Sequence, residues 1–287
     1  MMSGLPRFLQ SPGKSGPIRI MGVLNVTPDS FSDGGAFLAP EAAVRRADEL
    51  LAAGADLLDI GGESTRPFAP PVPAKEELQR VIPVIKTIRQ HHPAAVISVD
   101  TTKATVAREA LAAGADLIND ISALRFDPEM IELLREIEVP VVIMHMQGTP
   151  ADMQAAPRYR DVVGEIKEFL AARINWLTEQ GIAPERLIID PGIGFGKSVA
   201  HNLAIINRLA EFRSLGRPLL VGHSRKSFIG KILNLEEASA RDQPSAVLSA
   251  ICALHGADII RVHEVAATRQ ALRLAAALLT ANEEKEA

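Results

Sequence analysis

Short runs of valine, isoleucine and leucine alternate along the chain with longer stretches of helical periodicity. They predict eight β-strands, at 18–26, 55–61, 95–100, 115–121, 139–146, 186–192, 218–224 and 257–263. These runs are apolar at nearly every position, which is typical of strands that are covered on both faces. The stretches between them, such as 40–54, place alanine and leucine on one side and charged residues largely on the other, as surface helices do.

One joint between a helix and a strand is written three times in the chain. It reads "LAAGADLLDI" at 51–60, "LAAGADLIND" at 111–120 and "LHGADII" at 254–260. In each copy a helix end is followed by a glycine and then by the start of an apolar strand. Gly54, Gly114 and Gly256 stand where a helix end favours a residue that tolerates left-handed backbone angles. The repetition indicates a recurring helix-to-strand unit.

Eight strand–helix pairs with no break in composition predict a single-domain (β/α)₈ TIM barrel over residues 18–281. Residues 1–17 are then a flexible N-terminal extension and residues 282–287 a C-terminal tail. A doubly wound open sheet is the alternative. That fold would normally carry a glycine-rich dinucleotide loop after the first strand, and "LNVTPDSFSDGG" is not such a loop.

Composition narrows the classes of partner. The net charge of −4 and the aromatic content of 4% give neither the basic surface nor the stacking side chains that nucleic-acid binding requires. Cys252 is the single cysteine, which fits a reducing compartment. The sequence shows no secretory signal and no apolar run long enough for a membrane span, so we expect a cytoplasmic protein.

Polar residues gather where the predicted strands end. In a barrel of this kind the carboxyl ends of the strands open on the face where the chemistry occurs. Those ends supply Asn25, Glu63, Ser64, Thr65, Arg66, Asp100, Asn119, Asp120, His145, Gln147, Asp190, His223, Ser224, Arg225, Lys226, Arg261 and His263. The set predicts one polar pocket that holds both carboxylates and cations.

Three short strings resemble catalytic motifs but miss an essential residue. "PGIGFGKS" (191–198) has Pro191 where a phosphate-binding loop needs its first glycine. "GHSRK" (222–226) has Lys226 in place of the second glycine of a nucleophile elbow. "HEVAA" (263–267) lacks the second histidine of a zinc helix.

A longer set of blocks does hold together. The strings "MGVLNVTPDSFSDGG" (21–35), "DIGGESTRP" (59–67), "DPGIGFGK" (190–197) and "GHSRKSFIG" (222–230) closely resemble the dihydropteroate synthase family of pterin-binding enzymes. "SVDT", "NDIS", "MHMQGTP" and "RVHEV" follow the same pattern, so the resemblance covers 18–281. It implies a barrel-shaped transferase of folate biosynthesis that joins 6-hydroxymethyl-7,8-dihydropterin diphosphate to p-aminobenzoate and releases pyrophosphate.

The resemblance also implies how the pterin is held. Asp190 would accept hydrogen bonds from the 2-amino and N3–H groups, Asp100 and Asn119 would follow the polar edges of the ring, and Lys226 would meet ring acceptors. Met144 and Phe195 complete this set. From the residues alone, Asp190 and Asp100 are also candidates for helix N-caps. Asn119 and Asp120 point opposite ways as strand neighbours, and the resemblance favours Asn119.

A second group would bind the diphosphate. Arg261 and His263 are two residues apart on the last strand, so their side chains point the same way and suit phosphate oxygens. Thr65 offers a hydroxyl. Asn25 resembles the family's ligand for Mg²⁺, an ion that accepts few protein ligands. The expected catalytic residues are therefore Asn25, Asp33, Lys226, Arg261 and His263.

Two loops, 27–35 with Asp33 and 64–73, are expected to close over the site. By resemblance, Thr65, Arg66, Pro67, Lys226 and Ser227 frame the p-aminobenzoate pocket, where sulfonamides compete. Phe68 departs from the family, which commonly has glycine there, and leaves the amine specificity open. The family is commonly a homodimer, and the last helix (266–280) could either form an interface or cover the barrel.

Two other functions remain as alternatives. A methyltetrahydrofolate:corrinoid methyltransferase of the same superfamily would have no diphosphate to hold, so the first loop and "SRKS" (224–227) disfavour it. A non-catalytic pterin-binding paralogue is suggested by Phe68. Release of pyrophosphate separates the synthase from both.

Overall fold

The computed structural model describes residues 17–26, 35–64, 69–149, 153–154 and 156–283. Within them, strands and helices alternate. The strands are β1 (Arg19–Asn25), β2 (Leu57–Gly61), β3 (Val96–Asp100), β4 (Leu117–Asp120), β5 (Val141–Met144), β6 (Leu187–Asp190), β7 (Leu220–Val221) and β8 (Ile259–Val262). The α-helices are α1 (Gly35–Ala52), α2 (Ala74–His91), α3 (Ala104–Ala112), α4 (Glu129–Glu136), α5 (Val162–Glu179), α6 (Val199–Asn207), α7 (Ser227–Leu233), α8 (Asp242–Leu254) and α9 (Val265–Glu283). The 3₁₀ turns are η3 (Pro184–Arg186), η4 (Leu209–Leu215) and η5 (Ser239–Arg241).

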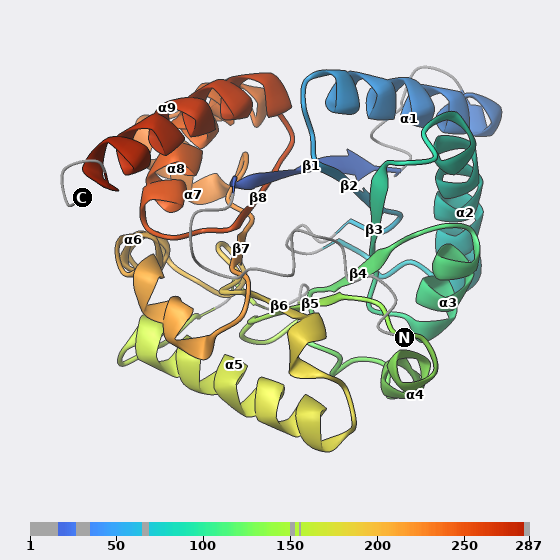
Figure 1. Ribbon diagram of the computed structural model, residues 1–287, viewed down its shortest axis with the longest axis horizontal. Helices are drawn as coiled ribbons and strands as arrows, with labels where there is room; N and C mark the ends of the chain where they lie inside the picture. The colour runs from blue at the N-terminus through green and yellow to red at the C-terminus, as the bar shows by residue number, and fades with distance from the viewer. Residues whose placement is uncertain (1–16, 27–34, 65–68, 150–152, 155, 284–287) are drawn as a thin grey trace.

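The strands form one parallel sheet that closes into a ring. Their order is β6-β5-β4-β3-β2-β1-β8-β7, and a bridge between Ile189 and Leu219 joins β6 to the residue before β7. Figure 1 shows this ring from one end, with the helices arranged around it. The predicted (β/α)₈ barrel is therefore confirmed, and the doubly wound alternative is wrong.

Every observed strand lies inside its predicted range and is shorter than predicted. The strand predicted at 218–224 shrinks to Leu220–Val221. Pro218, which has no N–H to donate, lies before it, and a turn at Ser224 and Arg225 follows it. The last helix begins at Val265 and runs to Glu283, a few residues beyond the predicted 266–280. None of the described helices is both long and apolar enough to cross a membrane.

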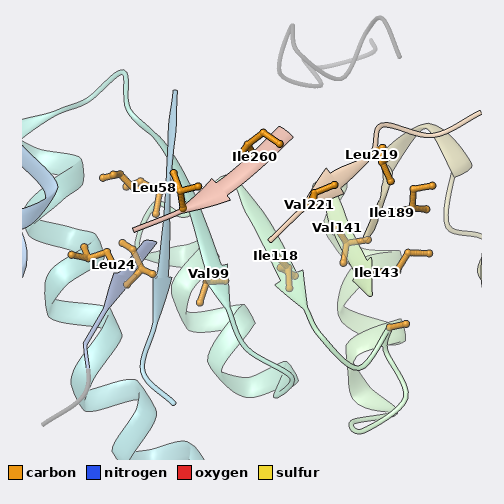
Figure 2. Close-up of a cluster of buried hydrophobic side chains, with 14 of the residues drawn as sticks. Leu24, Leu58, Val99, Ile118, Val141, Ile143, Ile189, Leu219, Val221 and Ile260 are labelled. Atoms are coloured by element: carbon orange, nitrogen blue, oxygen red, sulfur yellow. The ribbon is translucent and has the colours of Figure 1, made fainter. Parts of the chain in front are cut away.

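The outward faces of the strands pack against the helices. Leu58, Val99 and Ile118 come from successive strands and are fully buried in one cluster with residues of the surrounding helices (Figure 2). Each such side chain contributes roughly 1.5–3 kcal/mol by leaving water. The strands are therefore apolar on their outward faces. Because their inward faces are also buried, the sequence shows continuous apolar runs.

The inward faces form a separate apolar plug at the amino ends of the strands. The plug consists of Met21, Leu57, Leu117, Val142, Ile188, Leu220 and Ile259. Two positions further along several strands, the inward residue becomes polar: Asp59 follows Leu57, Asn119 follows Leu117, and Asp190 follows Ile188. The barrel is therefore sealed at one end and polar at the other.

The repeated joint has one structure in all three copies. Gly54, Gly114 and Gly256 have φ angles of 99°, 113° and 94°, which only glycine adopts readily. An arginine from another helix or turn lies against each: Arg269 against Gly54, Arg89 against Gly114 and Arg213 against Gly256. Each arginine donates to the glycine carbonyl and pairs with the aspartate two residues later.

That aspartate also ties the joint to the neighbouring strand. The carboxylate of Asp116 accepts from the backbone N–H of Ile97 at 2.7 Å. Asp56 accepts in the same way from Ile20, and Asp258 from Leu219. The string Gly-Ala-Asp is therefore a clamp that links a helix end, an arginine and the start of the adjacent strand.

Candidate active site

Inward-facing polar residues meet at the carboxyl end of the barrel. They include Asp100 on β3, Asn119 on β4, Asp190 on β6 and Arg261 on β8. Gly222 lies between the last two: a Cβ atom there would stand 3.7 Å from the Cβ of Arg261 and 4.0 Å from Oδ2 of Asp190. These four residues, which are distant in sequence, are thus brought together at the carboxyl end of the barrel.

Arg261 is the centre of a buried ion network. Its Nε donates to Oδ2 of Asp59 at 2.5 Å, and its Nη2 donates to Oδ2 of Asp100 at 2.7 Å. The same Oδ2 of Asp59 accepts from Nδ2 of Asn119 at 3.0 Å. Nη1 is the remaining donor group of Arg261 for an anion. The guanidinium is therefore held firmly by two carboxylates at this end of the barrel.

Asp190 sits at the end of β6 with 6% of its surface exposed. Its Oδ1 accepts from the backbone N–H of Gly192 at 2.7 Å. Burial raises the pKa of this carboxyl, and the charges of Lys226, Lys197 and Arg261 lower it again. The next helix begins at Val199 and is capped by Ser198, so Asp190 does not cap it.

Asp100 is likewise not a helix cap. The first N–H of α3, that of Ala104, is bound by Asp127 instead. Burial, and after it the charge of Asp59, raise the pKa of Asp100 to about 7, while Arg261 acts in the opposite direction. The carboxyl of Asp100 is therefore poised to change charge near neutral pH.

Asn119 and Asp120 point to opposite sides of β4. Asn119 joins the ion network inside the barrel, whereas Asp120 lies behind the sheet and accepts from the backbone N–H of Ser122 at 2.7 Å. Burial raises the pKa of Asp120 to about 6. Asp120 thus anchors the turn after β4, where Ala123 and Leu124 have positive φ angles.

An apolar wall lies beside the carboxylates. It is a small cluster of Ile121, Met144, Met146, Met153 and Phe195. The Nζ of Lys226 stands 4.4 Å from the centre of the Phe195 ring and donates to the carbonyl of Ile193. Burial lowers the pKa of Lys226 to about 7, and Asp190 partly restores it. Such an apolar wall beside charged groups suits a flat ring with polar edges, because the faces of the ring would meet methionine and phenylalanine while its edges would meet charges.

Lys197 holds two of these segments together. It is 3% exposed, donates to the carbonyl of Phe195 at 2.9 Å and to that of His145 at 3.3 Å, and lies 3.1 Å from Nδ1 of the same histidine. Lys197 and His145 are therefore bound to each other behind the apolar wall, as part of its support.

The last strand carries the residues expected at the diphosphate. His263 follows β8 directly, and its Nδ1 lies 3.1 Å from the hydroxyl of Ser224. Lys226 precedes α7 and Ser227 is the exposed first residue of that helix. Asp33, Thr65, Arg66, Pro67 and Phe68 lie outside the described residues, so their predicted roles stay predictions.

Asn25 ends β1, the strand that pairs with β8. Its side chain lies on the inward side of the strand. This is the same side as Met21 of the plug, because the two residues are four positions apart. Among the described residues, no three histidine, cysteine, aspartate or glutamate side chains form a metal-binding group. The expected role of Asn25 as a magnesium ligand stays a prediction.

The sequence reasoning missed Asp59. This residue is fully buried, and it binds both Arg261 and Asn119. Its signal was present, because a lone acid two residues after Leu57 shares the inward face of an otherwise apolar strand. His223, in contrast, was placed among the pocket residues but is turned away, and its Nε2 lies 2.9 Å from the carbonyl of Ser245 in α8.

Comparison with known proteins places this geometry in a family. A family model described as pterin binding enzyme matches residues 21–263. The dihydropteroate synthase of Escherichia coli K12 is 49% identical over 266 residues, which are 93% of each chain. The solved structure of Yersinia pestis dihydropteroate synthase with a sulfonamide drug has a TM-score of 0.88 at 44% identity and covers 97% of this chain and 98% of that one. The enzyme of Xanthomonas albilineans in complex with 7,8-dihydropteroate has a TM-score of 0.83 at 46% identity, with 92% and 94% covered.

Proposed function

This chain belongs to the dihydropteroate synthase family of pterin-binding enzymes, and from that membership we propose its reaction and the roles of its residues. It is a transferase of folate biosynthesis that joins 6-hydroxymethyl-7,8-dihydropterin diphosphate to p-aminobenzoate. The products are 7,8-dihydropteroate and pyrophosphate. The observation that carries the proposal is the meeting of Asp190, Lys226 and Arg261 at one mouth of the barrel.

The pterin ring lies in the slot between the apolar wall and the carboxylates. The ionised Asp190 accepts hydrogen bonds from the 2-amino and N3–H groups, and these charge-assisted bonds are the strongest available to it. Asp100 and Asn119 follow the other polar edges, and Lys226 donates to ring acceptors. Met144 and Phe195 contact the faces of the ring. The slot excludes water and so strengthens each of these bonds.

The diphosphate lies above β8. Arg261 and His263 bind its oxygens, and Thr65 adds a hydroxyl. Asn25 is the protein ligand that would hold magnesium there, and the ion would supply positive charge against the leaving pyrophosphate. Arg261 contributes the same kind of stabilisation from a position that Asp59 and Asp100 already hold, so no reorganisation is needed during the reaction.

The protein's task in the bond exchange is positional and electrostatic. The bond between the methylene carbon and the diphosphate oxygen breaks, and the amine nitrogen of p-aminobenzoate bonds to that carbon and releases a proton to solvent. Lys226 and Ser227, together with Thr65, Arg66 and Pro67, hold the amine close to the carbon. Asp33 belongs to the loop that closes over the diphosphate. Sulfonamides occupy the amine pocket.

The reaction is tested with the purified chain, magnesium, the pterin diphosphate and p-aminobenzoate. Release of pyrophosphate together with dihydropteroate detected by mass spectrometry supports the proposal. Tight binding of pterin without product would favour the non-catalytic paralogue. Methyl transfer from methyltetrahydrofolate to a corrinoid protein would favour the methyltransferase.

We also propose a homodimer in the cytoplasm. The packed pair α8 and α9 carries several exposed apolar side chains, of which Val247 is 58%, Leu274 71% and Leu278 58% exposed. A second copy of the chain would cover them. Light scattering tests the assembly: a monomeric mass for the wild type, or a dimer that survives Leu274→Glu and Leu278→Glu together, would contradict this interface.

A further inference from the structure

Asp59 is fully buried, and a single oxygen of its carboxylate accepts hydrogen bonds from two neighbouring side chains. Oδ2 accepts from Nε of Arg261 at 2.5 Å and from Nδ2 of Asn119 at 3.0 Å. Oδ1 is also buried and has no hydrogen-bond partner within the described part of the chain. A buried acid of this kind is costly, so its position calls for an explanation in the chemistry of the site.

We propose that Asp59 is a positioning residue for the pterin diphosphate: its Oδ2 sets the orientation of Arg261 and Asn119, and through Arg261 it acts on Asp100. The proposal rests on the function proposed above. It adds a residue that touches neither substrate but acts through three residues that do.

The orientation of Asn119 follows from the bond to Asp59. A carboxylate accepts and does not donate, so it selects the amide nitrogen of Asn119. The oxygen of the same amide is then directed away from Asp59 and is offered as an acceptor. Without Asp59 the amide could turn over and present a donor, which would face the N–H groups of the pterin.

The orientation of Arg261 follows from two carboxylates. Asp59 holds Nε and Asp100 holds Nη2, so the plane of the guanidinium is fixed and Nη1 is the group left for an anion. With Asp100 as its single partner, the guanidinium of Arg261 could rotate about that one contact. A group that is held before the reaction stabilises the leaving pyrophosphate without a cost in reorganisation.

The charge of Asp59 acts on Asp100. Burial is the main cause that raises the pKa of Asp100 to about 7, and the charge of Asp59 is the second. Loss of that charge therefore lowers the pKa of Asp100. The charged groups that act on Asp100 are Asp59 on β2, Arg261 on β8, Glu77 on α2, Asp120 on β4 and Lys226 before α7.

Two substitutions separate the two roles. Asp59→Asn keeps an oxygen in the place of Oδ2 and removes the charge, and its amide nitrogen takes the place of the unpartnered Oδ1. Asp59→Ala removes both hydrogen bonds. Asp120→Asn and Asp120→Ala are the matched controls, because Asp120 is equally buried but faces away from the barrel interior.

For Asp59→Ala we expect kcat/KM to fall about 100-fold, which is the usual result of a small displacement of catalytic groups. For Asp59→Asn we expect a smaller loss, and the acid limb of the rate profile shifts to lower pH. Asp120→Asn shifts that limb less, because the charge of Asp120 is the smallest of the contributions to Asp100. Isothermal calorimetry with the pterin that lacks a diphosphate measures the contribution of Asn119 separately.

The outcomes are distinct. If Asp59→Ala does not fold, the profile of Asp59→Asn decides, and an acid limb at the wild-type position overturns the role of the charge. If Asp59→Ala folds and keeps kcat/KM within a factor of two of the Asp120→Ala control, the positioning role is overturned. If the wild type itself makes no dihydropteroate, the proposed function fails, whereas the effect of Asp59 on pterin affinity is still measured by calorimetry.

Discussion

The two ends of the barrel differ in whether their sequence repeats from one strand to the next. At the amino ends of the strands, three joints repeat one string and one clamp, in which an arginine binds a glycine carbonyl and an aspartate. At the carboxyl ends the corresponding positions differ from strand to strand, from Gly61 to Asp100 to Asp190. A closed end has the same task in every unit, so its residues can repeat. An open end must surround one asymmetric ligand, so its residues cannot.

The charges at the two ends also behave differently. At the closed end, Arg89 and Asp116 form a partly exposed pair, with side-chain exposures of 25% and 39%. At the open end, Asp59, Asp100 and Arg261 are largely removed from water, and burial raises the pKa of Asp100. The closed end thus uses charge for stability, whereas the open end retains charge that costs stability and that serves binding in the proposed function.

The largest expected effect is on binding at the open end. Asp190→Asn places a donor against the donors of the pterin, and two charge-assisted bonds of roughly 1.5–3 kcal/mol each are lost. We expect the affinity for pterin to fall by about 100-fold or more, with the free energy of unfolding unchanged or higher, because a buried carboxylate is removed. Calorimetry measures the affinity, and the exposed Asp48→Asn is the control. An unchanged affinity would remove Asp190 from the pterin site.

A cluster near the same end tests whether all open-end charge serves binding. Lys103 joins Glu63 to the fully buried Glu77. Lys103→Met leaves Glu77 without its cation, and we expect a loss of about 3 kcal/mol in the free energy of unfolding. Urea unfolding measures it, with the exposed Lys86→Met on α2 as control. The double variant with Glu77→Gln should recover much of the loss, and failure to recover would show that Lys103 acts by packing.

The closed end is tested by Asp116→Ala. This change leaves the N–H of Ile97 and the guanidinium of Arg89 without their shared partner, so we expect a loss of about 2 kcal/mol in the free energy of unfolding. Because the clamp is remote from the substrates, kcat and both KM values should stay at the wild-type level. Thermal or urea unfolding and steady-state kinetics give the two readouts. A change in either KM would show that the closed end also affects substrate binding, which would contradict the contrast between the two ends.

The last expected effect is a dependence of stability on pH at Asp120. Burial raises its pKa from 3.8 to about 6 in the folded chain. Its favourable contribution is therefore complete below pH 3.8 and is lost as the pH rises through about 6. Relative to Asp120→Asn, the wild type should lose stability over that window and then run parallel. Urea unfolding at closely spaced pH values measures the difference, and parallel curves throughout would show that Asp120 does not titrate there.

Local pattern predicted much of this molecule. The eight strands, their order of appearance and the barrel follow from apolar runs and repeated glycine stops, because these signals are read within a single unit. The same reasoning located Asp100, Asn119, Asp190 and Arg261, since an inward-facing polar residue at the carboxyl end of a barrel strand lies near the mouth. Their separate roles came from resemblance to a family.

The sequence determined by itself which residues could face the cavity, because a strand alternates strictly between its two sides. It did not determine which of those residues touch. Asp59 bonds Arg261 across 202 positions and Asn119 across 60, and His223 turns from the mouth toward α8. Such choices depend on the closure of the ring and on how each buried charge finds a partner. That balance of desolvation and pairing is set by the tertiary structure, since no single strand contains both members of a pair.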